Sequence, residues 1–252
     1  SGNLYMRYNY TSYLNTNLPN FENMNGYYFP KGNGFISSFL ISYRGRFLKL
    51  SLQPHIYNTN SYKLSIPKKQ NEFSVLNDVP LNGSKLFKAK TMNTGIQIYF
   101  RELSFGYGNW NSWRGPGIHN SLSLSNNANG FYKYFLKLDE IKISQNLYLE
   151  SEYFVSDPIN NQNNVDFFIS SFALNLLYKN IDIGFSRQIN SGGHELIDWN
   201  QNDAFSVLFS SKYIKYWDSY RTYYFSTKFQ KSNTIIFYEI AYPEQRFLQN
   251  YN

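Results

Sequence analysis

Hydrophobic and polar residues alternate with a period of two along much of the chain. The alternation is clearest over residues 47–56, 141–152 and 181–190. In the first of these segments, one face carries the apolar residues Leu48, Leu50, Leu52 and Ile56. The other face carries the polar residues Lys49, Ser51, Gln53 and His55. This alternation is typical of β-strands that have one apolar and one polar face. Weaker alternation predicts seven further strands, at residues 35–43, 89–100, 103–108, 132–138, 166–178, 220–230 and 234–242.

The links between the first eight predicted strands are short and long in turn. Short links are expected at residues 44–45, 101–102, 139–140 and 179–180, and long polar links at about 58–88, 109–130, 156–165 and 191–219. A membrane β-barrel has short turns at one end and longer loops at the other. Aromatic residues near strand ends, such as Tyr43, Phe100 and Tyr178, suit the interfacial girdles of such a barrel. The pattern therefore favours an all-β, antiparallel transmembrane β-barrel over a soluble β protein with an aromatic core.

Two segments depart from this pattern. Residues 203–216 place apolar side chains at helical spacing, which predicts a short helix within a long loop. Residues 1–33 are polar and alternate poorly, so we expect a polar lead-in segment before a barrel that occupies residues 34–252. The chain shows no terminal aromatic strand of the outer-membrane type, so we expect about ten strands of a larger barrel, its N-terminal part.

The composition excludes several classes of protein. Aromatic residues make up 20% of the chain, which argues against general disorder. Cysteine is absent, which excludes a disulfide scaffold and any thiolate nucleophile or metal ligand. No apolar run is long enough for a transmembrane helix. The net charge is +7, and lysines gather loosely over residues 63–90. This segment is either a solvated loop or a surface that attracts acidic polysaccharide or lipopolysaccharide phosphate. The strand pattern leaves no dedicated groove for nucleic acid, which we do not expect as a partner.

The most distinctive stretch of sequence covers residues 110–128. Gly115-Pro116-Gly117 predicts a tight turn in which Pro116 presets φ and Gly117 takes a positive φ. The stretch resembles the Wzi capsule-assembly family of bacterial outer-membrane proteins, which shows an aromatic pair, Gly-Pro-Gly, a short strand and Ser-Asn-Asn-Ala. The matching positions are Trp113, Gly115, Pro116, Gly117, Asn120, Leu122, Ser125, Asn126, Asn127 and Ala128. Arg114 departs from the family pattern, because a second aromatic is usual there.

This resemblance implies a location, a function and partners. The protein would be a barrel in the bacterial outer membrane, with its long loops extracellular, that binds capsular polysaccharide and assists capsule assembly or attachment. Neither catalytic activity nor a cofactor is implied. The implied partners are capsular polysaccharide, outer-membrane lipid and lipopolysaccharide, and other capsule-export proteins.

Candidate carbohydrate-binding residues lie in the same stretch: Trp110, Trp113, Arg114, Asn120, Asn126 and Asn127. Two interpretations stay open for each kind of side chain. The tryptophans stack on sugar rings or anchor a packed loop. Arg114 pairs with an acidic sugar or forms an ion pair inside the barrel. Asn126 and Asn127 bind sugar hydroxyls or cap a turn.

The histidines offer little chemistry. His55, His119 and His194 lack the spacing of a metal site, and no local signature marks a catalytic triad. We therefore expect neither a metal site nor an enzyme, although catalysis by His119 with a nearby serine or glutamate stays a minor alternative. A soluble β-sandwich lectin is a second alternative. The third is a porin-like channel whose polar lumen would include Lys49, Gln53, Lys142, Glu150 and Glu152.

Overall fold

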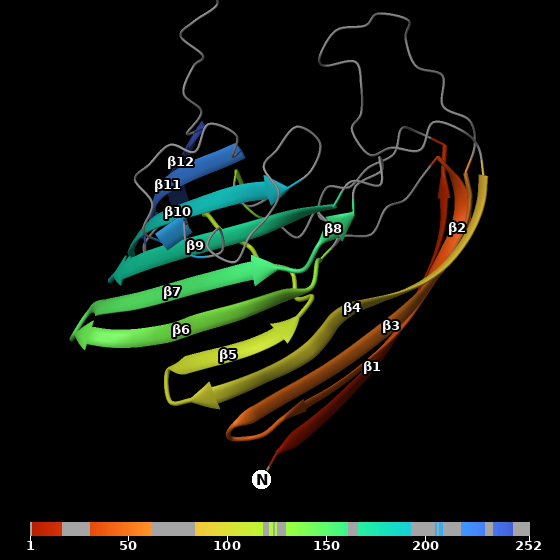
Figure 1. Cartoon of the computed structure of the whole chain (residues 1–252), viewed down its shortest axis with the longest axis horizontal. Helices are drawn as coiled ribbons and strands as arrows, with labels where there is room; N and C mark the ends of the chain where they lie inside the picture. Colours follow the sequence, from red (N-terminus) through yellow and green to blue (C-terminus); the bar gives the residue numbers. More distant parts are fainter. Residues whose placement is uncertain are drawn as a thin grey trace, which may run out of the picture.

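The structure, a computed structural model, describes residues 2–16, 31–61, 84–117, 121–122, 124, 130–160, 166–192, 205, 207–208, 218–229 and 234–243. Within these residues, twelve strands form one antiparallel sheet (Figure 1). The strands are β1 (Asn3–Asn15), β2 (Gly32–Arg44), β3 (Leu48–Ser61), β4 (Ser84–Phe100), β5 (Leu103–Gly108), β6 (Lys133–Ser144), β7 (Leu147–Ser156), β8 (Ile159–Asn160), β9 (Asp166–Tyr178), β10 (Ile181–Gly192), β11 (Asp218–Phe229) and β12 (Thr234–Pro243). The prediction of an all-β antiparallel fold is confirmed.

Eleven of the strands pair in chain order, and the two-residue β8 pairs with β9 beside them. Since each strand runs antiparallel to the one before it, successive links lie at opposite ends of the sheet. Short turns follow β2, β4, β6 and β9 at one end of the sheet, and the strand ends that the longer connections join lie at the other end (Figure 1). The predicted alternation of short and long links is therefore confirmed. β1 and β12 are the two edges of the sheet, and no ladder joins them within the described residues.

The predicted link at residues 139–140 is wrong, because β6 continues through it. The register between β6 and β7 shifts between Leu138 and Ile141, which marks a β-bulge with an extra residue on β6. The turn lies instead at Gln145-Asn146, so the predicted strand over residues 141–152 is divided between β6 and β7. A bulge reverses which residues face which side, and this change of phase resembles a strand boundary in the sequence.

β1 lies within residues 1–33, where the sequence analysis expects a polar lead-in. Apolar and aromatic residues do occupy alternate positions there, as in Leu4, Met6 and Tyr8, but tyrosines at Tyr5 and Tyr13 on the opposite face blur the alternation. β1 pairs with β2 along its whole length. It is therefore a full member of the sheet.

Most of the predicted helix over residues 203–216 lies outside the described residues. Phe205, Val207 and Leu208 are described and have helical backbone conformation. In the described part of the chain, no helix combines the length and the apolar character needed to cross a membrane.

The strand register assigns every side chain to one of two faces, because directly paired residues share a face. We call the face that carries Gln53, Gln97 and Phe154 the inner face, and the face that carries Leu52 and Ile96 the outer face. Polar side chains of the inner face are buried: Ser51, Gln53, Thr59, Gln97, Ser104, Lys133, Ser171, Ser186 and Thr222. A small apolar cluster of Phe135, Phe154 and Ile169 lies among them.

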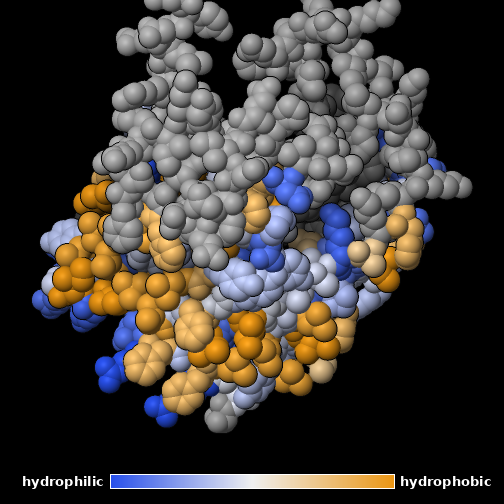
Figure 2. Space-filling view, in the orientation of Figure 1, coloured by the Kyte–Doolittle hydropathy of each residue, from blue (hydrophilic) through white to orange (hydrophobic). Residues whose placement is uncertain are grey.

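Large apolar side chains of the outer face are exposed instead. Leu52 is 47% exposed, Leu136 is 45% exposed and Ile183 is 51% exposed. Figure 2 shows apolar side chains gathered over the region where β5, β6 and β7 lie in Figure 1. A half-buried antiparallel sheet in water shows the opposite arrangement, with its apolar face packed on the core and its polar face solvated. The distribution of polar and apolar side chains is therefore reversed in this sheet.

The two-residue turn between β4 and β5 offers a test of the backbone conformation. Arg101 has a φ of +56°, a conformation that disfavours residues with a side chain, whereas Glu102 does not have a positive φ. Both are exposed. We expect Arg101→Gly to raise the free energy of unfolding by about 1 kcal/mol, measured by urea denaturation of the refolded protein.

The matched control is Glu102→Gly, which adds backbone freedom without relieving strain. It is expected to lower the same free energy by about 0.5–1 kcal/mol. Equal effects of the two substitutions would contradict the described turn.

Candidate functional site

Residues 109–117 follow β5 and cross the inner face of the sheet. The indole Nε1 of Trp110 donates a hydrogen bond to Ser51 Oγ on β3, at 3.1 Å. Farther along the same connection, Ser121 Oγ donates to Glu239 Oε1 on β12, also at 3.1 Å. β3 and β12 lie in opposite halves of the strand order, so the sheet curls around this connection (Figure 1).

Asn109 fixes the start of this segment against β4. Its backbone N–H donates to Thr94 O at 3.0 Å, and its side-chain Oδ1 accepts the Thr94 N–H at 2.7 Å. Its Nδ2 donates to Thr91 O at 2.7 Å. These bonds satisfy the backbone of a bulge in β4, where Asn93 has a φ of +43°. Asn109 is thus buried because it completes hydrogen bonds that the bulge leaves open.

Trp110 anchors the segment by packing. Its ring meets Phe135 edge-on at a centroid distance of 5.7 Å, and Lys49 Nζ lies 5.2 Å from the ring centroid. Glycines make room for the indole: a Cβ on Gly108 would lie 2.5 Å from a ring carbon. Trp110 therefore has the contacts of a packed loop anchor, and its ring also borders the cavity described below.

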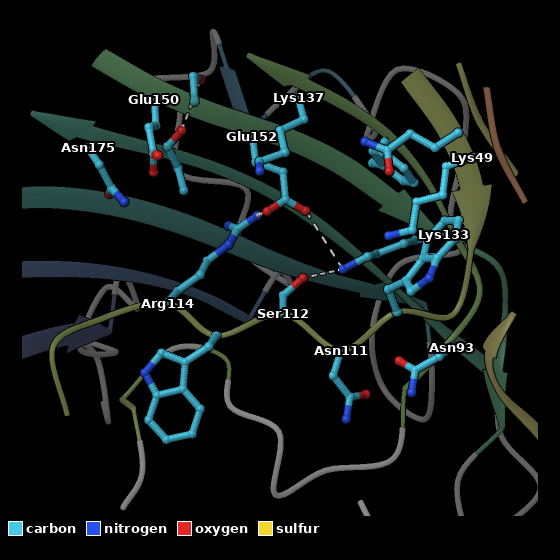
Figure 3. A pocket seen from close by; sticks show the side chains of 16 residues that line it. Lys49, Asn93, Asn111, Ser112, Arg114, Lys133, Lys137, Glu150, Glu152 and Asn175 are labelled. Carbon is cyan, nitrogen blue, oxygen red and sulfur yellow. Dashed lines mark hydrogen bonds and ion pairs between the residues drawn. The ribbon is translucent and has the colours of Figure 1, made fainter. Parts of the chain in front are cut away.

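Three charged side chains form a buried cluster where the segment meets the sheet (Figure 3). Glu152 lies between Arg114 and Lys133: its Oε2 is 3.3 Å from Arg114 Nη2, and its Oε1 is 3.7 Å from Lys133 Nζ. Arg114 Nη1 also donates to Ser171 Oγ at 2.6 Å, and Lys133 Nζ donates to Ser112 Oγ. Arg114 therefore forms the inward-facing ion pair that the sequence analysis named as one of its two roles.

The aromatic ring of Phe154 lies beneath both cations of this cluster. The guanidinium carbon of Arg114 is 5.0 Å from the ring centroid, and Lys133 Nζ is 4.6 Å from it. Only 7% of Arg114 and 3% of Lys133 is exposed. Partial withdrawal from water strengthens the attraction of each cation to Glu152 and to the ring.

A cavity of about 450 Å³ lies beside the cluster. Its lining combines four cationic residues, two carboxylates, amide and hydroxyl side chains, and three aromatic rings. The charged and indole side chains of the lining are those of Lys49, Trp110, Trp113, Arg114, Lys133, Lys137, Glu150 and Glu152. Trp113 is 37% exposed, and its Nε1 donates to Gly115 O at 3.0 Å, which leaves its ring at the cavity. A cavity lined by aromatic rings, amides and charged groups suits a polar ligand that also has apolar faces.

The predicted turn contains one error. Gly115 has a φ of +122°, whereas Gly117 does not have a positive φ. A Cβ on Gly115 would lie 2.5 Å from Glu239 Oε1, so the close carboxylate of β12 decides which glycine is required. Pro116 lies between them in a bend, as expected of a proline in a turn.

Several other candidates lie outside the described residues: Asn120, Asn126, Asn127, His119 and His194. His55 is buried on the inner face of β3, with its ring 5.0 Å from that of Tyr57. Among the described residues, no three His, Asp or Glu side chains gather as a metal site would require.

Sequence reasoning did not single out Lys133 and Lys137 as site residues. A signal for them exists, because Lys133, Phe135 and Lys137 alternate with apolar residues in a predicted strand. Alternation gives the face of each lysine, but the pairing of β6 with β7 brings Lys133 near Glu152, and the curl of the sheet brings both to the 109–117 segment.

Comparison with protein-family models, with curated proteins and with solved structures finds no match to this chain.

The charged cluster predicts a large effect of neutralising Glu152. Glu152→Gln would leave Arg114 and Lys133 close together without their shared counter-charge, and we expect the free energy of unfolding to fall by about 3 kcal/mol. Residues 109–117 should also become more sensitive to protease, because the contact of Arg114 with the sheet weakens. Urea denaturation and limited proteolysis measure the two effects.

Glu140→Gln is the control, since Glu140 is an exposed carboxylate on β6 outside the cluster. It should leave both measurements unchanged. Similar losses in the two variants would mean that the ion cluster does not hold the segment.

Proposed function

We propose that the protein is an outer-membrane β-barrel that binds capsular polysaccharide at the bacterial cell surface and assists capsule assembly or attachment. The observation that carries this proposal is the reversed sheet, with buried polar side chains on the inner face and exposed apolar side chains on the outer face. The short and long connections at opposite ends of the sheet are a second feature of such barrels.

The outer face supports contact with lipid. Exposed apolar residues extend over neighbouring strands, as Ile98, Phe105 and Leu136 do along one register row. Contiguous apolar patches larger than a few hundred Å² are rare on soluble monomers. A bilayer removes this surface from water, and the hydrophobic effect then favours insertion.

Insertion places a demand on the edges of the sheet. Unpaired backbone N–H and C=O groups cannot be satisfied in hydrocarbon, so a membrane-spanning sheet needs both edges paired. The proposal therefore requires that β1 and β12 be paired in the membrane.

The cavity and the sequence resemblance together support a polysaccharide ligand. Aromatic faces suit the C–H-rich faces of sugars, and Trp113 combines exposure with a place in the cavity lining. Asn93, Asn111 and Gln97 add amides that can bind hydroxyls. The resemblance of residues 113–128 to the Wzi family supports the same assignment.

A porin-like channel is the second candidate, and the charged inner face favours it. Residues 109–117 lie against that face, where they would obstruct a pore, which argues against an open channel. Conductance of the protein in planar bilayers distinguishes the two functions, because an open channel conducts ions steadily. A soluble β-sandwich is the third candidate. It needs two sheets, whereas the described residues form a single sheet.

Leu52, on the outer face near the middle of β3, tests insertion. Leu52→Arg should lower the free energy of unfolding in lipid vesicles by about 2–4 kcal/mol, because a cation would be placed in hydrocarbon. The measurement is urea denaturation in vesicles, followed by tryptophan fluorescence.

Leu52→Ile, which keeps the apolar surface, should cost less than about 1.5 kcal/mol. The membrane assignment fails if Leu52→Arg folds as well as the parent and the protein stays soluble without detergent.

Trp113 tests polysaccharide binding. Trp113→Ala should weaken retention of the detergent-purified protein on immobilised capsular polysaccharide by about tenfold, since a stacking face is lost. Trp113→Tyr keeps an aromatic face and should retain most of the binding.

Tyr238→Ala serves as the control, because Tyr238 is exposed on the outer face of β12. It should bind like the parent. Absence of retention in the parent protein, or retention that is indifferent to Trp113→Ala, would refute the proposed function.

A further inference from the structure

The charges around the cavity are unequal. Lys49, Arg114, Lys133 and Lys137 line it, against Glu150 and Glu152, so the lining carries a net charge of +2. In Figure 3, Lys49 and Lys133 lie at one end of the cavity, and Glu150 lies at the other end beside Asn175. One end of the cavity is therefore cationic.

Three of these four cations have a carboxylate partner within the described residues, and the fourth does not. Arg114 and Lys133 share Glu152, and Lys137 Nζ lies 2.7 Å from Asp139 Oδ1. Lys49 has no ion pair in the described part of the chain. The charged groups that act on it are Arg44, Lys137 and Asp139, two positive and one negative. Its ammonium group lies over the ring of Trp110 and borders the cavity.

A second donor near the cluster lacks an acceptor. Arg114 is 7% exposed, and its buried Nε has no hydrogen-bond partner within the described residues. That nitrogen is closed off from solvent, so a ligand oxygen does not reach it and it stays a cost of the fold. Lys49, which borders the cavity without an ion pair in the described residues, is therefore the cation that a ligand with oxyanion oxygens would pair with.

We propose that the cavity binds an anionic group of the polysaccharide, the carboxylate of a uronic acid residue, at its Lys49 end. This inference rests on the proposed function and names the class of glycan. The sugar ring would meet the aromatic groups Trp110, Trp113 and Phe135, and the amides of Asn93 and Gln97 would bind its hydroxyls. Sulfate and phosphate share the same oxyanion chemistry, so the test compares an acidic glycan with a free anion.

The experiment is calorimetric titration of the detergent-purified protein with three probes: oligogalacturonate, a neutral dextran oligosaccharide and inorganic phosphate. Lys49→Gln should weaken oligogalacturonate binding at least about tenfold, because it removes the unpaired cation. Lys49→Arg keeps the charge and should retain binding, so that binding follows the charge at this position; unchanged urea denaturation of Lys49→Gln excludes misfolding as the cause of its loss. Lys142→Gln, which removes an exposed lysine of β6 outside the cavity, should bind like the parent.

The outcomes separate this inference from the proposed function. Equal binding of oligogalacturonate and dextran, unaffected by Lys49→Gln, overturns the anionic subsite and leaves polysaccharide binding in place. Tight binding of inorganic phosphate without oligogalacturonate also overturns it, since the site would then serve a free anion. If none of the probes binds and immobilised capsular polysaccharide is not retained, the proposed function fails as well.

Discussion

Polar and charged side chains on the inner face of this sheet are withdrawn from water, and each must find its partners there. Burial without a partner costs several kcal/mol for a charge and about 1–3 kcal/mol for a neutral group. Gln53 meets this demand through Ser38 and Asn93, and Gln97 meets it through Ser104. The inner face is therefore held together by specific hydrogen bonds and ion pairs, together with buried apolar side chains such as Ile36, Met92 and Phe154.

The connection after β5 is part of the same network. Arg114 reaches Glu152 and Ser171 on two different strands, and Trp110 reaches Ser51 on a third. Removing the connection would leave Glu152 beside a single lysine, and removing Glu152 would leave two cations facing each other. The position of the connection and the polarity of the inner face consequently depend on each other.

Local alternation was enough to predict most strands and the fold class, because the face of a residue depends on its own strand. It failed where the chain changes phase, at the bulge of residues 139–140, and where aromatic residues occupy both faces, as in β1. The period of two residues does not by itself reveal where a bulge inserts an extra residue. Register and bulges depend on contacts with neighbouring strands, which a single strand does not reveal.

The site was predictable only in part, for a related reason. The sequence indicated the stretch that borders the cavity and placed Glu152 on a polar face, yet pairing Arg114 with Glu152 requires the sheet to curl until the connection meets β7. The same curl brings Glu239 of β12 against Gly115, which has the positive φ and leaves no room for a Cβ beside the carboxylate. Curvature also concentrates charge: inner-face lysines from β3 and β6, far apart in sequence, come to line one cavity with too few carboxylates to balance them. An oxyanion from outside the chain would supply the missing counter-charge, so the geometry that packs the inner face also leaves a place for a ligand.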